Sequence, residues 1–240
     1  MISLIMPYYE NPEMLQRHFN EWSRWPEKLR AEYKFIIVDD GSPNSPAVEV
    51  TRPTGLCDIE IYRVLEDRPW HQHGARNLGA HVAPEGWLLL TDMDHVLERG
   101  PADGLVYRTR YRQPPLNPSA AFMFARIEAD TRQPTRNDRG EPKPHPNSFL
   151  MTRDLYWQVG GYDENYCGIY GTDSLFRKRL PVITHLDVPL IRYSRDMGAA
   201  DASTRTLPRK DQPNRAQLRA AVAAKNLPIK TLDFPWRREC

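Results

Sequence analysis

The 240-residue sequence predicts an α/β fold whose central sheet is mainly parallel and flanked by helices. Short apolar runs recur without polar alternation, which is typical of strands buried on both faces. Segments with helical spacing separate them, giving the order β-α-β-β-α-β as far as Leu90. The length fits one large domain, which buries roughly 70–75% of its unfolded surface.

The first half of the chain supplies the clearest elements. Ile2–Met6 is an apolar run closed by Pro7, as expected of a buried first strand. Asn11-Pro12-Glu13 provides an N-cap, a proline at the first helical position and an acid in the first turn, so a helix is expected over about residues 12–24. Further elements follow from the same patterns: strands at Phe35–Val38, Ile59–Val64 and Trp87–Leu90, and a helix at Gly74–Ala83.

Beyond residue 100 the spacing of apolar residues is less regular. Strands are predicted at Leu105–Arg112, Ala120–Ile127, Phe149–Thr152, Val182–Leu186 and Leu190–Tyr193, and helices at Arg153–Val159, Asp173–Leu180 and Asn214–Asn226. The polar, proline-rich stretch Ala129–Asn147 predicts a mobile loop, either a lid or a disordered segment. The organisation expected is one domain over residues 1–194, followed by a basic C-terminal extension with a short helix over residues 195–240.

Composition excludes several classes of protein. A formal charge of +2 gives no strong attraction to nucleic acid or to an anionic membrane. The longest apolar runs fall far short of the ~20 residues that span a bilayer, so stable membrane insertion is not expected. Three scattered cysteines, Cys57, Cys167 and Cys240, indicate neither a disulfide framework nor a zinc site, and a cytoplasmic location is expected.

Polar or aromatic residues follow three of the predicted strands. The first strand ends in Pro7-Tyr8-Tyr9, the second in Asp39-Asp40-Gly41-Ser42, and the fourth in Asp92-Met93-Asp94. In open α/β sheets ligands bind outside the carboxyl ends of the strands, so three such endings indicate a site.

The Asp-x-Asp pattern itself has two interpretations. Two hard oxygen ligands with open positions suit Mg²⁺ or Mn²⁺ shared with phosphate oxygens, whereas an isolated pair is more often a solvated turn. The chain has no G-x-x-x-x-G-K-[ST] and no G-x-G-x-x-G after a strand. Neither a P-loop enzyme nor a dinucleotide dehydrogenase is therefore supported.

Five segments, in order, resemble family 2 glycosyltransferases of the GT-A fold: "SLIMPYYENPEMLQRHFNEW", "FIIVDDGS", "GARNLGA", "LLLTDMD" and "VGGYDENYCGIYGTDSLFRKRL". The last also resembles the C-terminal motif of galactosyltransferases, and the match covers about residues 2–180. The resemblance implies a metal-dependent, inverting enzyme that moves a hexosyl or N-acetylhexosaminyl group from a UDP-linked donor to an acceptor hydroxyl.

The resemblance also implies roles for single residues in donor binding. Tyr9 would stack on the base, Asp40 would accept the N3–H of uracil with Asp39 beside it, and Arg76 and Asn77 would line the sugar nucleotide. The full donor-binding set implied is Pro7, Tyr9, Asp39, Asp40, Arg76, Asn77 and Asp92.

The metal and the base are assigned in the same way. Asp92 and Asp94 would hold Mn²⁺ or Mg²⁺ on the diphosphate, with His185 as a candidate third ligand. Asp173 would be the general base for the acceptor hydroxyl.

One departure from the family pattern leaves alternatives open. The usual Glu-Asp pair is Thr172-Asp173 here, so an inactive nucleotide-sugar-binding module is the main alternative. Asp163 and Glu164 are other candidate bases, or form structural hydrogen bonds in their turn. A nucleotidyltransferase usually has a glycine-rich basic loop after the first strand, and "PYYENPE" argues against it.

Two further points stay open. His71, His73 and His81 have a loose metal-like spacing, but without cysteine partners or H-E-x-x-H they are expected to line the donor pocket or to face solvent. The acceptor could be a polysaccharide, a lipid, a protein or a nucleic-acid base.

Overall fold

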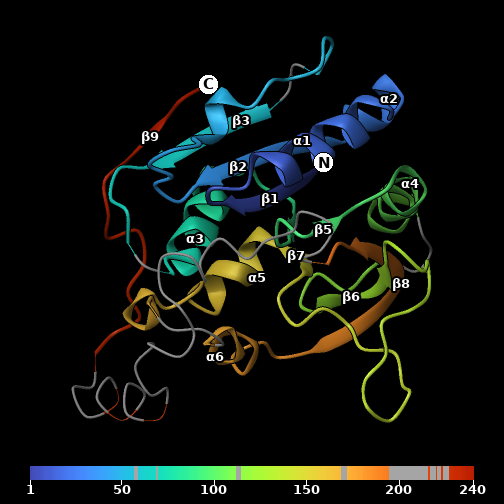
Figure 1. Ribbon diagram of the computed structural model, residues 1–240. Helices are drawn as coiled ribbons and strands as arrows, with labels where there is room; N and C mark the ends of the chain where they lie inside the picture. The colour runs from blue at the N-terminus through green and yellow to red at the C-terminus, as the bar shows by residue number, and fades with distance from the viewer. Residues whose placement is uncertain are drawn as a thin grey trace.

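A computed structural model describes residues 1–56, 59–68, 70–111, 115–168, 172–194, 216, 220, 223 and 227–240. These residues form one nine-stranded sheet with the strand order β5-β8-β6-β7-β4-β1-β2-β3-β9 (Figure 1). The strands are β1 Ile2–Tyr8, β2 Tyr33–Asp39, β3 Ile59–Val64, β4 Trp87–Leu90, β5 His95–Val96, β6 Ala121–Glu128, β7 Phe149–Thr152, β8 Ile183–Arg192 and β9 Trp236–Arg238.

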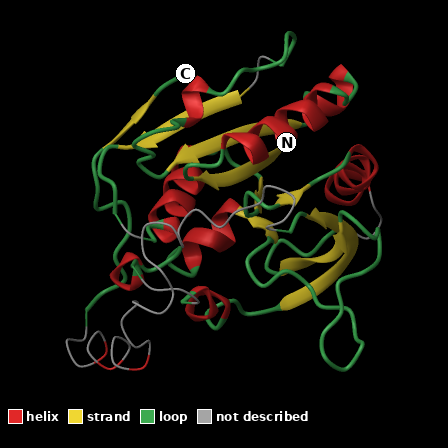
Figure 2. Ribbon diagram, viewed as in Figure 1, coloured by secondary structure: helices red, strands yellow, loops and turns green. Residues whose placement is uncertain are grey.

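The sheet is mainly parallel, as the sequence predicts. The pairings place β1, β2, β3, β4, β6 and β8 in one direction and β5, β7 and β9 in the other. The helices are α1 Pro12–Ser23, α2 Glu27–Arg30, α3 Gln72–Val82, α4 Arg99–Val106, α5 Arg153–Gln158 and α6 Asp173–Arg177, with the short helical turns η1 Ala47–Glu49, η2 Tyr107–Tyr111 and η3 Glu164–Tyr166 (Figure 2).

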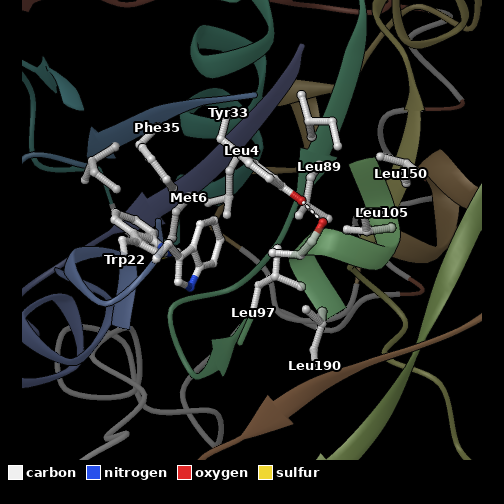
Figure 3. Packing of buried hydrophobic residues seen from close by; sticks show 14 of the residues in the cluster. Leu4, Met6, Trp22, Tyr33, Phe35, Leu89, Leu97, Leu105, Leu150 and Leu190 are labelled. Carbon is white, nitrogen blue, oxygen red and sulfur yellow. Dashed lines mark hydrogen bonds between the residues drawn. The ribbon is translucent and has the colours of Figure 1, made fainter. Parts of the chain in front are cut away.

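Both faces of the sheet are buried, which explains the apolar runs without alternation. Leu4 and Met6 of β1 belong to a core that includes Trp22 of α1 and Phe35 of β2 (Figure 3). The Trp22 and Phe35 rings stack with centroids 4.3 Å apart. Ile5, between Leu4 and Met6, points to the opposite face, into a second core that includes α3. A strand with two buried faces has no polar side.

The ends of α1 and the packing of α3 follow directly from the sequence. The Asn11 side chain accepts a hydrogen bond from the Met14 backbone N–H at 3.2 Å, and Pro12 occupies the first turn. On α3, a Cβ added at Gly79 would lie 2.2 Å from Ile5 Cγ2. Only glycine lets this helix approach β1 so closely.

Most predicted elements are confirmed within a few residues, and β3 and β4 have the predicted bounds. The strand predicted over 105–112 is wrong. Leu105 lies in α4, and the π-helical turn η2 follows. Ala102 and Leu105, three positions apart, share the buried side of that helix. The predicted strands 182–186 and 190–193 are one strand, β8, whose register against β6 shifts between Phe124 and Ala125.

The segment 129–147 forms no helix or strand of its own, and only isolated bridges occur there, such as Ile127 with Pro134. Except for positions 216, 220 and 223, the helix predicted over 214–226 lies outside the described residues, as does Cys57. Cys167 and Cys240 are free thiols. Within the described ranges, no helix is both long and apolar enough to cross a membrane.

The far end of the predicted extension is part of the sheet. β9 pairs antiparallel with β3, with Trp236 opposite Val64 and Arg238 opposite Tyr62. The segment 227–240 therefore packs back onto the first half of the domain, beside elements more than one hundred and fifty residues earlier in the chain (Figure 1).

Candidate active site

Three strand ends meet at one edge of the sheet. β1 lies between β2 and β4, with Tyr8 opposite Asp39 and Ile5 opposite Leu90. The Thr91 backbone N–H donates to the Ile5 carbonyl at 3.1 Å, which brings the Asp-x-Asp turn beside the end of β1. The predicted convergence of the three polar endings is thus present. Pro7 itself lies within β1, paired with Val38.

Asp39 organises the loop after β2. Its carboxylate accepts the backbone N–H groups of Ser42 and Ala47, each at 2.8 Å, and the residue is 1% exposed. Burial raises the pKa of Asp39, and these hydrogen bonds act against that rise. Both carboxylate oxygens accept bonds from the loop, so Asp39 fixes the loop that follows β2.

Asp40 has a different environment. Its Oδ1 lies 3.0 Å from His71 Nδ1, and its backbone N–H donates to the Tyr8 carbonyl at 2.9 Å. Burial raises the pKa of Asp40 to about 6, and the hydrogen bond with His71 opposes this rise. The Tyr9 hydroxyl bonds the Asp67 carboxylate at 3.1 Å. Tyr9, Asp40, Asp67 and His71 together form a polar group at the end of β1 and β2.

Asp92 is held by the first turns of α3. The fully buried Arg76 guanidinium donates to Asp92 Oδ1 and, at 2.8 Å, to the Asn147 carbonyl. Gln72, one turn earlier, donates to the same Asp92 oxygen at 2.5 Å. Burial works to lower the pKa of Arg76, but the neighbouring Tyr162 and Asp92 together raise it, so the guanidinium stays charged.

Asp94 is the more exposed of the two acids, with 39% of its side chain accessible against 20% for Asp92. Its Oδ1 lies 2.6 Å from His95 Nδ1. Burial acts to raise the pKa of Asp94, but His95 and Arg192 outweigh it and the pKa is lowered. Asp94 is therefore ionised at neutral pH.

Two carboxylates at this edge fit a hard divalent cation. The described residues contain no group of three or more His, Cys, Asp or Glu arranged to hold one. Besides His95, a second histidine lies beside the acids: His145 has Nε2 3.4 Å from Asp92 Oδ2, and its ring stacks on His95 at 3.8 Å. Its Nδ1 bonds Ser148 Oγ at 2.7 Å, which fixes the ring.

The structure corrects the assignment of His185 as a third ligand. His185 is exposed on β8 opposite Met123, whereas Arg192 of the same strand pairs with His95. Seven residues of strand at about 3.3 Å each place His185 roughly 20 Å from the Asp-x-Asp turn. Because β8 is one continuous strand, it carries His185 away from the site.

Asn77 also differs from its assigned role. It is fully buried, and its amide makes four hydrogen bonds: from Tyr156 Oη and the Tyr162 N–H, and to the Tyr162 carbonyl and Glu164 Oε1. An amide has no further donors after two such bonds. Asn77 joins α3 to the turn at 160–166 instead of lining the donor.

Asp173 begins α6 and lies on the same side of the molecule as Arg76. Its charge acts on His73, Arg76 and Tyr162, and the Tyr162 hydroxyl also responds to Asp92. Thr172 stands where the family has glutamate. It is 2% exposed, with Oγ1 3.3 Å from His73 Nε2. Asp173 thus has no acid at the preceding position.

The turn acids Asp163 and Glu164 have structural partners. Asp163 accepts from the Lys230 N–H at 3.2 Å, and Glu164 accepts from the Leu232 N–H at 2.7 Å. Both are under a tenth exposed. Their hydrogen bonds hold the segment 227–240, in line with the interpretation that Asp163 and Glu164 make structural hydrogen bonds.

The three histidines with metal-like spacing lie in different places. His71 is buried beside Asp40, His73 is buried with Nδ1 3.2 Å from the Asp163 carbonyl, and His81 is exposed near the Trp236 ring. Burial lowers the pKa of His73 to about 4. Only His71 reaches the candidate donor site.

Sequence reasoning missed Asp67, Gln72 and His145 as members of the site. Gln72 stands one turn before Arg76, so helical spacing from Arg76 could have found it. Asp67 and His145 lie in irregular segments, where no periodicity points to a partner. A shallow depression of about 590 Å³ along α1, lined by Glu13, Arg17 and Val50 among others, contains none of the predicted site residues.

The sheet order and the acidic strand ends define the GT-A class of nucleotide-diphospho-sugar transferase folds. Among solved structures, S. aureus TarS residues 1–349 in complex with UDP-GlcNAc matches with a TM-score of 0.62 at 15% identity, covering 83% of this chain and 61% of that one. GalNAc-T7 with UDP, GalNAc and Mn²⁺ matches with a TM-score of 0.59 at 13% identity, covering 81% and 44%. The predicted GT-A fold is confirmed.

Sequence relatives agree with this class. The undecaprenyl-phosphate 4-deoxy-4-formamido-L-arabinose transferase of Proteus mirabilis is 28% identical over 93 residues, 39% of this chain and 28% of that protein. The enzyme of the same name from Sodalis glossinidius is 29% identical over 103 residues, 42% of this chain and 31% of that protein. The matches thus span less than a third of these relatives, and no protein-family model matches the chain.

Proposed function

We propose that the chain is a glycosyltransferase that binds a UDP-linked sugar at the edge formed by β1, β2 and β4 and transfers the sugar to an acceptor hydroxyl. One observation carries the proposal: Asp40 and the pair Asp92 and Asp94 follow strands on either side of β1. Two strand spacings of about 4.8 Å put these acids roughly 10 Å apart, the scale of a nucleoside diphosphate.

Each part of a donor has a matching group at this edge. Asp40 offers a carboxylate oxygen to the N3–H of uracil, and the half-exposed Tyr9 offers a ring for stacking. The buried Arg76 cation behind Asp92 adds positive charge near the proposed diphosphate position. When bound at Asp92 and Asp94, Mn²⁺ or Mg²⁺ supplies charge stabilisation of the leaving diphosphate.

Asp173 is the proposed general base. The carboxylate takes the proton of the acceptor hydroxyl while its oxygen forms a bond to the anomeric carbon. The bond from that carbon to the diphosphate oxygen breaks, and UDP leaves with its electron pair. Because attack and departure occur on opposite faces, this single displacement inverts the anomeric carbon.

The comparisons support the donor and the cation more than the acceptor. TarS is described with UDP-GlcNAc, and GalNAc-T7 with UDP and Mn²⁺. The relatives named as undecaprenyl-phosphate transferases match over 39–42% of this chain. The acceptor is therefore proposed only as a hydroxyl, and the cytoplasmic location stays a prediction.

The alternative is an inactive nucleotide-sugar-binding module, favoured by the buried Thr172 in place of glutamate. Such a module would bind UDP-sugar without turnover. An Asp173→Asn variant separates the two: in an enzyme it abolishes transfer while donor affinity stays within about twofold, and in a binding module it changes nothing.

The proposal is tested by nucleotide binding. Thermal unfolding is followed with UDP, GDP, CDP and dTDP, with and without Mn²⁺, for the wild type and for the double variant Asp92→Ala/Asp94→Ala. We expect stabilisation by UDP that requires Mn²⁺ and disappears in the double variant, because binding to the native state raises its stability by mass action. Stabilisation by none of the four nucleotides would contradict the proposal.

A further inference from the structure

The segment 227–240 passes beside His71 and is anchored on both sides of Phe234. At one end, the Glu164 carboxylate accepts the N–H groups of Leu232 and Asp233 at 2.7 and 3.1 Å. At the other, the Leu65 N–H donates to the Pro235 carbonyl at 2.9 Å, and β9 pairs with β3. Phe234 lies between these two anchors.

Phe234 packs on the histidine that contacts Asp40. The rings of Phe234 and His71 meet edge to face, with centroids 4.5 Å apart and an interplanar angle of 87°. Phe234 is 7% exposed and His71 is 1% exposed. Gly74 lies where the two rings meet, since a Cβ there would lie 2.3 Å from the His71 ring and 2.7 Å from Phe234. Phe234 and the Gly74 backbone thus pack closely on the imidazole.

The fixed ring presents Nδ1 to Asp40. The 3.0 Å contact joins His71 Nδ1 to Asp40 Oδ1, while Nε2 is buried with no hydrogen-bond partner among the described residues. An N–H at Nε2 would have no acceptor there, so the proton is favoured on Nδ1, where it donates to the carboxylate. One Asp40 oxygen is thereby fixed, and within the described ranges no hydrogen bond engages the other.

We propose that His71 is a positioning residue of the nucleotide-base site and that Phe234, from the segment 227–240, holds it in place. The inference rests on the proposed function, because it places a uracil N3–H at the free oxygen of Asp40. It assigns to this segment a role in donor binding.

The physical reason is the burial of Asp40. A carboxylate in this environment tends to take up a proton or to rotate toward another donor, and the His71 N–H acts against both. Without that N–H the oxygen aimed at the base is no longer fixed. Loss of the His71 side chain should therefore weaken only the hydrogen bond from the uracil N3–H to Asp40. The other contacts to the nucleotide should keep their strength.

The test measures binding of UDP and of N3-methyl-UDP, both with Mn²⁺, by calorimetry on the full chain. The variants are His71→Ala, His71→Asn and Phe234→Ala, and Trp236→Ala is the matched control. Trp236 is in the same segment but packs on Tyr62 and His81, away from His71. Thermal unfolding of each variant shows whether it folds.

We expect His71→Ala to weaken UDP binding about tenfold or more, the cost of one hydrogen bond to a charged group. Binding of N3-methyl-UDP, which has no N3–H, should stay within about twofold of wild type. His71→Asn, whose amide nitrogen replaces Nδ1, should recover most of the UDP affinity. Phe234→Ala should weaken UDP binding about threefold to tenfold, and Trp236→Ala should leave it unchanged even if it lowers Tm equally.

Two results would overturn the inference. Wild-type affinity in His71→Ala and Phe234→Ala would show that neither residue positions Asp40. An equal loss of affinity for UDP and for N3-methyl-UDP in these variants, with the same loss in Trp236→Ala, would show that His71 and Phe234 only stabilise the fold. A wild-type chain that binds no nucleotide would instead overturn the proposed function, so the two failures are distinct.

Discussion

Two aspartates of the candidate site each contact a histidine, but their pKa values are shifted in opposite directions. Asp40 Oδ1 meets His71 Nδ1 at 3.0 Å, and Asp94 Oδ1 meets His95 Nδ1 at 2.6 Å. The Asp40 side chain is 10% exposed and that of Asp94 is 39% exposed. Burial raises the pKa of Asp40 to about 6, whereas the charges of His95 and Arg192 outweigh burial and lower that of Asp94.

The comparison shows that the surroundings, not the pairing, set the chemistry of each acid. A buried carboxylate with a raised pKa suits a hydrogen bond from an uncharged base, and an ionised, more exposed one suits a cation. In each motif the neighbouring acid is fixed by the protein: Asp39 by backbone N–H groups and Asp92 by Arg76. In each motif, therefore, one acid is tied directly to the protein framework.

The largest effect is expected at Asp94. Asp94→Asn removes the charge that holds the cation, and we expect on the order of a 10³-fold loss of transfer rate, about 4 kcal/mol of transition-state stabilisation. Steady-state kinetics over a Mn²⁺ titration would measure it. His185→Ala, on the exposed far part of β8, is the control and should change nothing. A comparable loss in that variant would restore His185 to the site.

The next effect is on stability. Asp39→Ala leaves the buried N–H groups of Ser42 and Ala47 without acceptors, and we expect a loss of about 3 kcal/mol in the free energy of unfolding. Urea denaturation would measure it. A loss below about 1 kcal/mol would mean that the loop after β2 has other support, and the contrast between Asp39 and Asp40 would weaken.

A smaller effect is expected from the isosteric change Asp40→Asn. The amide can still accept from N3–H through its oxygen but has lost the charge, so we expect UDP affinity to fall about 30-fold, or about 2 kcal/mol. Calorimetry with UDP and CDP would show whether preference for uracil falls in parallel. An unchanged UDP affinity would mean that the uracil ring binds away from Asp40.

The smallest effect concerns pH. Because the pKa of Asp40 is raised from 3.8 to about 6, its ionised form is lost as pH falls through about 6. We expect UDP affinity at pH 5 to be about tenfold weaker than at pH 7.5, with a smaller change in Asp40→Asn. The sign for stability is opposite: the folded state binds this proton more tightly, so the contribution of Asp40 to stability increases as pH falls from about 7 to 4. An identical pH profile in both proteins would contradict this assignment.

The first half of the fold was predictable because its signals are local. An N-cap, apolar runs buried on two faces and a turn sequence defined β1, α1, β2, β3, α3 and β4. The strand predicted over residues 105–112 was wrong because Leu105 belongs to a helix. Ala102 and Leu105 are the buried residues of that helix, and two positions are too few to show helical periodicity in the sequence. β9 could not be predicted, because three residues form a strand only where β3 offers an open edge.

The acids of the site were predictable from strand ends, and their partners were not. Which of two adjacent aspartates faces outward depends on where Ser42 and Ala47 point their N–H groups. His71 acquires a role only because Phe234, far along the chain, packs on it. His185 was misplaced because the sequence does not show that β8 continues unbroken.

The pairing of β9 with β3 has a consequence for how the chain folds. Residue 236 must find residue 64, and contacts of such long separation form late because loop closure costs entropy before any contact offsets it. Until then β3 presents an unpaired edge with Ile59, Ile61 and Val64 beside it. We expect a slow final folding step during which this edge can recruit a second chain, so refolding yield should fall with protein concentration.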